Sequence, residues 1–174
     1  FYPSDGLDEG DSLMQWACEI GPDDTVIDLY FKKIYPVAVA SVLEVCDLFR
    51  AGNPPHIVPN EAEASYERRC TPRHCRVVWN RPVKQAYDLI RGANPAPGAW
   101  TTYKGAKLGI FDSARVPGDG ISSRIRAITD AGIEVQCVGG RVLVKRVRPE
   151  GGAKMSATEW AAQVGLQPGD EFDS

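Results

Sequence analysis

The residues best suited to chemistry stand at the start of the sequence, in an acidic turn framed by glycines. Gly6 and Gly10 bracket the stretch Leu7-Asp8-Glu9. The carboxylates of this turn are Asp5, Asp8, Glu9 and Asp11. A carboxylate can accept a proton or hold a water molecule for attack, which is general acid–base work. From the residues alone, a turn aspartate that bonds to its own backbone is the preferred alternative.

A second group with chemical potential is the stretch from Cys70 to Cys75, which also contains His74. Thiolate and imidazole groups can bind zinc, but zinc sites usually draw four ligands from two paired clusters. The sequence has no second cluster, so we expect no metal site. We expect the cysteines to be free thiols, and three of them sit in apolar surroundings. The five cysteines are Cys18, Cys46, Cys70, Cys75 and Cys137.

Charge is distributed unevenly along the 174 residues. Residues 66–154 hold 17 of the 20 Lys and Arg but only 7 of the 23 Asp and Glu, a formal charge of +10. The two flanks together carry a formal −13, which gives the net charge of −3. Such asymmetry indicates either a face that binds an anion or a basic domain packed beside an acidic one. No apolar run reaches the roughly 18 residues that span a bilayer, so we expect no membrane association.

The elements that position these groups divide into two parts. In the first, Ser12–Ile20 is predicted as a strand, and a helical pattern then runs to Arg50. Pro36 lacks a backbone N–H and predicts two helices or a kink at Tyr35-Pro36. Residues 37–49 are apolar on nearly all sides, which predicts deep burial. A proline-rich connection follows over residues 53–75.

The second part begins with a helix that Asn80 caps and that ends near Arg91. Its buried face is predicted from the helical spacing of Val83, Ala86, Tyr87 and Ile90. Short strands are then expected near 99–103, 107–112, 124–129, 133–138 and 141–147, which favours a small barrel. A final helix is predicted between a capping box and Gly165. The capping box consists of Ser156 and Glu159.

Three stretches together resemble the formyltetrahydrofolate-dependent formyltransferase family. The first is "DGLDEGD" followed by "GPDDT", the second is "VVWNRPVKQAYDLIRGANPAPGAWT", and the third is "VRPEGGAKMSATEW". The family includes methionyl-tRNA formyltransferase and the hydrolase domain of formyltetrahydrofolate dehydrogenase. The order and spacing of all three stretches carry the resemblance, which covers almost the whole chain.

The resemblance implies an α+β fold in which the end of a doubly wound catalytic domain leads into an OB-like β-barrel with a C-terminal helix. We predict a catalytic-domain remnant over 1–65, a linker and helix over 66–98, and the OB-like domain over 99–174. Asp8 matches the family's catalytic Asp, and formyltetrahydrofolate is the implied formyl donor. The family's catalytic Asn and His precede this region, so we expect this chain alone to be inactive and an upstream half to complete the site.

The resemblance also implies a use for the basic residues of the C-terminal domain, which holds tRNA in some members of the family. The wider basic set is Arg124, Arg126, Arg141, Lys145, Arg146, Arg148 and Lys154. We select Arg124, Arg126, Lys145 and Arg146 as substrate-binding residues that contact tRNA phosphates. The favoured function is a cytoplasmic methionyl-tRNA formyltransferase that serves protein biosynthesis. The alternatives are a formyltetrahydrofolate hydrolase and a non-catalytic module that binds RNA or a partner.

Overall fold

The structure is a computed structural model that describes residues 1–121 and 123–173. Two compact units divide the chain. Unit 1 consists of Phe1–Pro22 and Asp28–Arg69, and unit 2 consists of Asp23–Ile27 and the residues from Cys70 onward. The domain boundaries predicted from sequence, after residues 65 and 98, stay predictions.

Unit 1 begins with an irregular segment, and the strand predicted for Ser12–Ile20 is wrong. Only Ser12 pairs with another segment, through two backbone hydrogen bonds of 2.8 and 2.9 Å with Ile57. A strand requires a partner along its length, and the proline-rich stretch near Ile57 provides one residue of pairing before the two segments separate. Unit 1 also contains the short 3₁₀ turn η2, Glu61–Glu63.

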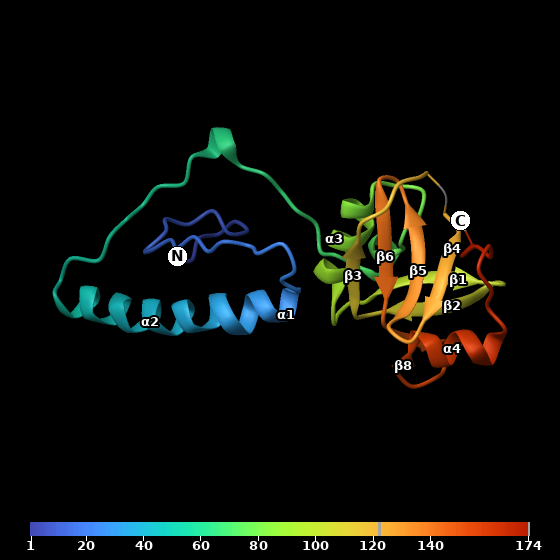
Figure 1. The fold of residues 1–174 in the computed structure, drawn as a ribbon. Helices are drawn as coiled ribbons and strands as arrows, with labels where there is room; N and C mark the ends of the chain where they lie inside the picture. The colour runs from blue at the N-terminus through green and yellow to red at the C-terminus, as the bar shows by residue number, and fades with distance from the viewer. Residues whose placement is uncertain (122, 174) are drawn as a thin grey trace. The chain divides into compact units, whose positions relative to one another are not determined.

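A continuous helical run follows, with α1 at Val26–Asp28, the π-helical turn η1 at Leu29–Ile34 and α2 at Tyr35–Arg50. The predicted break or kink at Tyr35-Pro36 is wrong, because Ile34 and Tyr35 both keep helical backbone angles and only the hydrogen-bond pattern changes there, from π to α. Figure 1 shows the run as one continuous coil. The predicted burial of residues 37–49 is wrong, since α2 has no buried residue. A helix that is apolar on all sides needs cover on all sides, and the other described segments of unit 1 are largely irregular.

Unit 2 contains two four-stranded antiparallel sheets, in the orders β1-β2-β7-β8 and β3-β6-β5-β4 (Figure 1). The strands are β1 Ala99–Tyr103, β2 Ala106–Ile110, β3 Ser113–Val116, β4 Ile125–Thr129, β5 Gly132–Cys137, β6 Gly140–Val144, β7 Arg146–Pro149 and β8 Met155–Ser156. The five predicted strand segments are confirmed in position, except that 141–147 divides into β6 and β7. The predicted α+β class holds, whereas the OB-like description stays a prediction.

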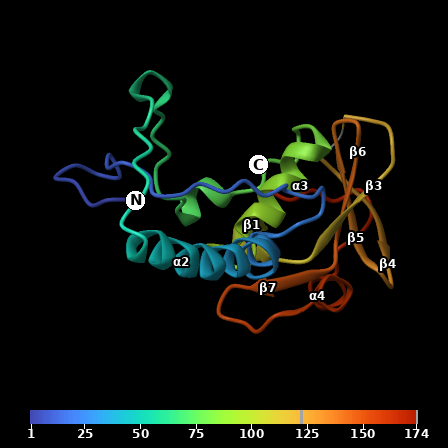
Figure 2. The ribbon, with the colours of Figure 1, turned by 90° about the vertical axis from the view of Figure 1, so that its left-hand side faces the viewer.

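Two helices accompany the sheets, α3 at Val83–Ala93 and α4 at Ala157–Val164. Helix α3 packs against β3 and β6, and α4 packs against β5 and β7 (Figures 1 and 2). The Ser156 half of the predicted capping box is confirmed, because its hydroxyl accepts from the Glu159 amide at 3.1 Å. The predicted stop at Gly165 is also confirmed, because Gly165 adopts a φ of 67°. Within the described residues, no helix is long and apolar enough to cross a membrane.

An aromatic cluster joins the ends of unit 2. Trp79 stacks on Phe172 with ring centroids 5.4 Å apart, and Tyr103 meets Trp160 edge to face at 5.7 Å. The Trp79 Nε1–H donates to the Thr101 hydroxyl at 3.0 Å, which satisfies both polar groups in the buried core. The segment before α3, strand β1, helix α4 and the C-terminal tail therefore share one packed centre.

Truncation of Ile90 is expected to destabilise unit 2. Ile90 is fully buried on the face of α3 predicted from sequence, together with Ala86 and Tyr87. The Ile90→Ala change removes buried methyl groups and leaves a cavity, so we expect a loss of roughly 2–5 kcal/mol in chemical denaturation. The exposed Gln85→Ala change on the same helix is the control and should stay within about 0.5 kcal/mol. Equal stabilities of the two variants would contradict the burial of this face.

Burial of Cys137 is expected to make unit 2 sensitive to alkali. Desolvation raises the pKa of its thiol from 9.0 to about 11, and the side chain is 0% exposed. Below pH 9 the thiol is protonated in both the folded and the unfolded chain. Between pH 9 and 11 only the unfolded chain loses this proton, so stability should fall across that window by up to about 3 kcal/mol.

The measurement is the free energy of unfolding at pH 8.5 and at pH 11 for the wild type and for Cys137→Ala. The variant should lose less stability than the wild type across this interval, because it has no buried thiol at residue 137. Cys18→Ala, at an exposed position, should match the wild type. A Cys137→Ala variant with the full wild-type loss would show that the thiol does not control the alkaline transition.

Candidate functional site

The acidic turn of unit 1 has a backbone geometry that demands a glycine at residue 10. Asp8 adopts a φ of 55°, in the left-handed region that few residues other than glycine enter. A Cβ on Gly10 would lie 1.7 Å from the Tyr2 carbonyl oxygen, a backbone atom, whereas a Cβ on Gly6 would meet the Glu9 carboxylate, the flexible end of a side chain. The turn therefore closes tightly and presents the exposed Asp8 on a strained backbone, a feature that often accompanies functional sites.

A histidine lies beside the same turn, although it contacts Asp11 rather than Asp8. His56 Nδ1 is 3.2 Å from the Asp11 carboxylate Oδ2. The imidazole ring stacks on Tyr2 with centroids 4.2 Å apart and an interplanar angle of 5°. A carboxylate that fixes one ring nitrogen leaves the other free to exchange protons. The structure thus brings His56 to Asp11 and does not join it to the predicted catalytic Asp8.

The four basic residues predicted to bind substrate do not form one cluster along the strands. Arg124 directly precedes β4 and Arg126 lies in it, whereas Lys145 directly precedes β7 and Arg146 is its first residue. Strands β4 and β7 belong to different sheets. Arg124 forms an ion pair with Glu171 at 2.9 Å, and Arg146 lies 3.8 Å from the Asp112 carboxylate. Arg126 and Lys145 are exposed. The role of all four in binding stays a prediction.

A different set of cations gathers around two aromatic rings on the sheet β1-β2-β7-β8. Two cations lie over the Trp100 ring, with Arg76 at 5.6 Å and Lys107 at 4.8 Å from its centroid. Two more lie over the Phe111 ring, with Arg148 at 5.4 Å and Lys154 at 3.7 Å. We call these six residues the Trp100 face: Arg76, Trp100, Lys107, Phe111, Arg148 and Lys154.

Strand register explains how the Trp100 face assembles. Trp100 of β1 lies opposite Gly109 of β2, and Gly109 lies opposite Arg148 of β7. A hollow of about 360 Å³ lies beside Gly109 and Arg148. Its lining consists of Lys107, Gly109, Arg148, Pro149, Glu150, Gly151 and Gly152. Cations beside an open aromatic ring can attract phosphate groups while the ring stacks on a base.

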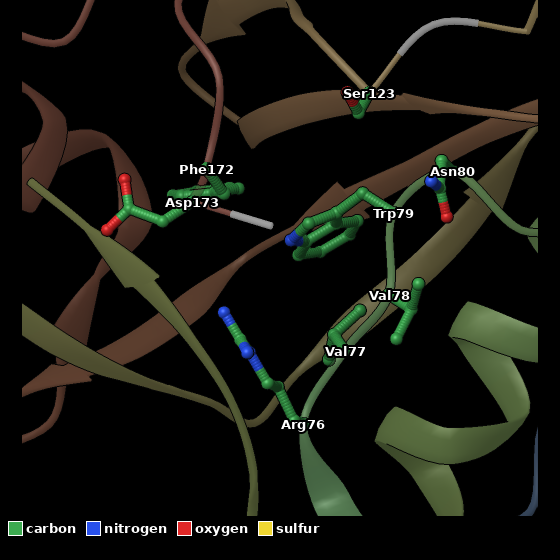
Figure 3. Close-up of a pocket in the computed structure, with 8 residues that line it drawn as sticks. All are labelled: Arg76, Val77, Val78, Trp79, Asn80, Ser123, Phe172 and Asp173. Carbon is green, nitrogen blue, oxygen red and sulfur yellow. The ribbon is translucent and has the colours of Figure 1, made fainter. Parts of the chain in front are cut away.

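A smaller pocket of about 100 Å³ lies beside the aromatic cluster (Figure 3). Its lining residues are Arg76, Val77, Val78, Trp79, Asn80, Ser123, Phe172 and Asp173. Figure 3 shows the Arg76 side chain extending toward the side of the pocket that holds Trp79 and Asp173. Hydrogen bonds from the Gly105 and Lys104 amides hold the Asp173 carboxylate and lower its pKa. The pocket has room for a few water molecules or a very small ligand.

The described part of the chain contains no cluster of side chains suited to bind a metal ion. Among residues 1–121 and 123–173, no three His, Cys, Asp or Glu side chains come together as metal ligands would. Cys70 and Cys75 do meet, with their sulfur atoms 3.5 Å apart, while His74 Nδ1 accepts from the Thr71 amide at 3.1 Å. The functional potential of this fold therefore lies in the acidic turn, the Trp100 face and the two thiols.

The fold of unit 2 and the order of its elements define a class of protein. Residues 69–165 match the formyl transferase, C-terminal domain family over more than half of the chain, so the chain belongs to that family. Over 98% of its length it is 30% identical to the cytosolic 10-formyltetrahydrofolate dehydrogenase of Xenopus laevis. Over 94% of its length it is 27% identical to the methionyl-tRNA formyltransferase of Desulforamulus reducens.

Solved structures agree on the fold. A variant of HypX from Aquifex aeolicus matches 97% of the chain with a TM-score of 0.74 and 16% identity. HypX from the same organism in complex with tetrahydrofolic acid matches 98% of the chain with a TM-score of 0.74. The chain spans about a fifth of the length of the dehydrogenase, about half of the formyltransferase and about a third of HypX. The family resemblance found in the sequence is thereby confirmed.

Sequence reasoning found some of these residues and missed others. It identified Asp8 from the resemblance and named Arg148 and Lys154 within a broad basic set. It missed Lys107, whose place beside Trp100 depends on strand pairing across a hairpin, and Arg76, which pairs with Trp100 through an isolated parallel bridge. A signal was nonetheless present, since Trp100 and Lys107 sit seven residues apart on either side of a Lys-Gly turn, a spacing that folds them onto neighbouring strands.

Proposed function

We propose that this chain is part of an enzyme that takes the formyl group from a 10-formyltetrahydrofolate donor. The observation that carries the proposal is the strained, glycine-framed turn that presents Asp8 in a chain of the formyl transferase family. The names of the relatives add support. Two kinds of dehydrogenase carry 10-formyltetrahydrofolate in their names, and a third relative is named a formyltransferase. A HypX structure contains tetrahydrofolic acid.

In this proposal Asp8 acts as a general acid–base group and also binds a water molecule. Formyl transfer begins when a nucleophile attacks the formyl carbon and forms a tetrahedral intermediate. The nucleophile must lose a proton, and the departing folate nitrogen must gain one. An exposed carboxylate on a rigid turn can accept the first proton and return it. Donors that stabilise the oxyanion, and most of the folate pocket, come in this proposal from a further polypeptide segment.

The acceptor distinguishes two versions of the proposal. In a hydrolase or dehydrogenase the acceptor is water, and in a formyltransferase it is an amine. The pairing of Arg124 with Glu171 and of Arg146 with Asp112 favours the version without a polyanionic acceptor at those residues. The cytosolic location in the dehydrogenase name supports a cytoplasmic site of action for this chain.

Replacement of Asp8 is expected to abolish most of the activity in the complete protein that carries this chain. Asp8→Asn preserves the shape of the turn, but an amide cannot accept a proton. We expect the release of tetrahydrofolate from 10-formyltetrahydrofolate to slow by roughly 10²–10⁴-fold. Asp5→Asn, an exposed carboxylate of the same turn, is the matched control and should retain the wild-type rate.

One outcome would contradict the role of Asp8, and another would contradict the need for a further segment. Wild-type turnover by Asp8→Asn would exclude Asp8 from proton transfer. Steady turnover by the isolated chain, abolished by Asp8→Ala, would show that no further segment is required. We expect the isolated chain neither to bind the donor tightly nor to turn it over.

A second candidate function is binding of tRNA, which the Trp100 face favours. Four cations flank two aromatic rings there, and a methionyl-tRNA formyltransferase is similar over 94% of the chain. Phosphate contacts release counterions, so the affinity should fall steeply with salt. In this version Lys107 and Arg148 contact phosphates while the Trp100 ring stacks on an unpaired base.

The test is titration of labelled tRNA with the folded chain at about 50 and 200 mM salt. Lys107→Glu with Arg148→Glu should weaken binding and reduce the log–log salt slope by roughly 0.7–0.9 for each lost contact. Lys84→Glu, on the exposed side of α3, is the control for a change of net charge.

The outcomes separate the alternatives. A loss of tRNA binding in the Arg126→Glu, Lys145→Glu variant, without a loss in the variant of Lys107 and Arg148, would favour the residues predicted from sequence over the Trp100 face. No binding at low salt would remove the RNA role of this domain.

A further inference from the structure

Two cysteine thiols meet at the start of unit 2. The sulfur atoms of Cys70 and Cys75 are 3.5 Å apart, close to van der Waals contact. Cys70 is exposed, whereas Cys75 is 0% exposed and belongs to the hydrophobic core. The chain therefore places one thiol that reagents can reach directly against one thiol that they cannot.

The segment between the two cysteines is already folded into a closed turn. It contains the 3₁₀ turn η3, Pro72–Cys75. The His74 amide donates to the Thr71 carbonyl oxygen at 2.9 Å, and the Cys75 thiol lies 3.6 Å from the same oxygen. From outside the turn, the Trp100 indole N–H donates to the Pro72 carbonyl oxygen at 2.6 Å. These contacts hold the two sulfur atoms together before any bond forms.

We propose that Cys70 and Cys75 form a reversible intrachain disulfide, with a hydroperoxide as the oxidant. Bonded sulfur atoms lie about 2.05 Å apart, so closure requires a movement of about 1.5 Å. Disulfides in reducing compartments are usually transient and sensitive to redox conditions, which fits a pair with one exposed member. This modification is independent of the folate chemistry proposed above.

The chemistry proceeds in two balanced steps. The Cys70 thiolate attacks one peroxide oxygen, the O–O bond breaks, and Cys70 becomes a sulfenic acid while the other oxygen leaves as water or an alcohol. The Cys75 thiolate then attacks the Cys70 sulfur, the S–S bond forms, and hydroxide leaves and takes up a proton as water. Two thiols thus lose two electrons in total, and the hydroperoxide gains them.

The different burial of the two thiols sets the order of the two oxidation steps and the pH dependence of the second. Cys70 reacts first because a peroxide can reach only the exposed thiol. Desolvation, followed by the contact with Cys70, raises the pKa of Cys75 to about 11. Only a small fraction of Cys75 is therefore thiolate at neutral pH, and the second step should accelerate about tenfold for each pH unit up to that value.

The remaining cysteines offer no better partner within the described residues. Cys18 and Cys46 belong to unit 1, and Cys137 is buried in β5. In the described part of the chain, the sulfur–sulfur contact is the one between Cys70 and Cys75. The cross-link would tie Cys70, where the chain re-enters unit 2, to the core and close a ring that contains residues 71–74.

The sequence provides a direct assay for this bond. Trypsin cleaves after Arg69, Arg73 and Arg76, so digestion separates Cys70–Arg73 from His74–Arg76. The two peptides stay joined only if the disulfide is present. Treatment of the whole folded chain with hydrogen peroxide, then alkylation and digestion, should yield the joined peptides. Dithiothreitol should separate them again.

Variants make the proposal falsifiable even if one of them folds poorly. Cys70→Ser should abolish the joined peptides and leave Cys75 unmodified in the folded chain. Cys75→Ala should accumulate Cys70 sulfenic acid that dimedone captures, whereas the wild type should give at least about tenfold less dimedone adduct, because its sulfenic acid is consumed by the second thiol. Cys18→Ser is the control and should behave like the wild type. Circular dichroism establishes which variants are folded.

Three results would overturn the proposal. The first is an absence of joined peptides in a folded, peroxide-treated wild type whose Cys70 is oxidised. The second is equal dimedone capture in the wild type and in Cys75→Ala. The third is a cross-link that forms only after the chain is unfolded, because the proposal depends on the folded proximity of the two thiols.

Discussion

The stacking of Trp79 on Phe172 is the contact on which the arrangement of unit 2 depends. The two residues lie more than ninety positions apart in the sequence, and each is only 3% exposed. Aromatic pairs of this kind add about 0.5–1.5 kcal/mol beyond the area that they bury. Because the Trp79 indole also binds Thr101 in β1, the stack fixes the segment before α3 against both a strand and the C-terminal tail. The pocket beside Trp79 is lined by both members of this stack.

Electrostatics divides the cations of unit 2 into two kinds. Some face carboxylates, such as Arg141, which forms an ion pair with Glu134 at 2.7 Å. Others lie over aromatic rings, such as Lys107 over Trp100. A cation over a ring keeps most of its charge available to a ligand, whereas a cation beside a carboxylate is largely neutralised locally. The formal charge of residues 66–154 therefore overstates how much positive charge a ligand would meet at β4. It understates how much positive charge a ligand would meet on the sheet around Trp100.

The sequence predicted the elements whose signals lie within one segment. It did not predict elements that depend on pairing or packing with another segment. Helix α3 followed from its spacing, and α4 followed from Ser156 and Gly165, because periodicity and caps are properties of a single segment. The strand predicted for Ser12–Ile20 failed because a strand forms only with a partner. Strand β3 was missed because it is short and lacks clear alternation. Among the site residues, Asp8 came from a motif, whereas the meeting of Cys70 with Cys75 depends on the packing of a turn.

Gly109 lines the hollow beside Arg148 and lies opposite Trp100 on the neighbouring strand. A Cβ there would lie 3.3 Å from the Phe111 ring and 3.5 Å from the Arg148 carbonyl oxygen. A larger residue would thus push on the ring that carries Arg148 and Lys154. One position without any charge can therefore adjust the spacing of the cations on this sheet. Among related chains, variation at this position would change how closely a string of negative groups can approach, even where every lysine and arginine is retained.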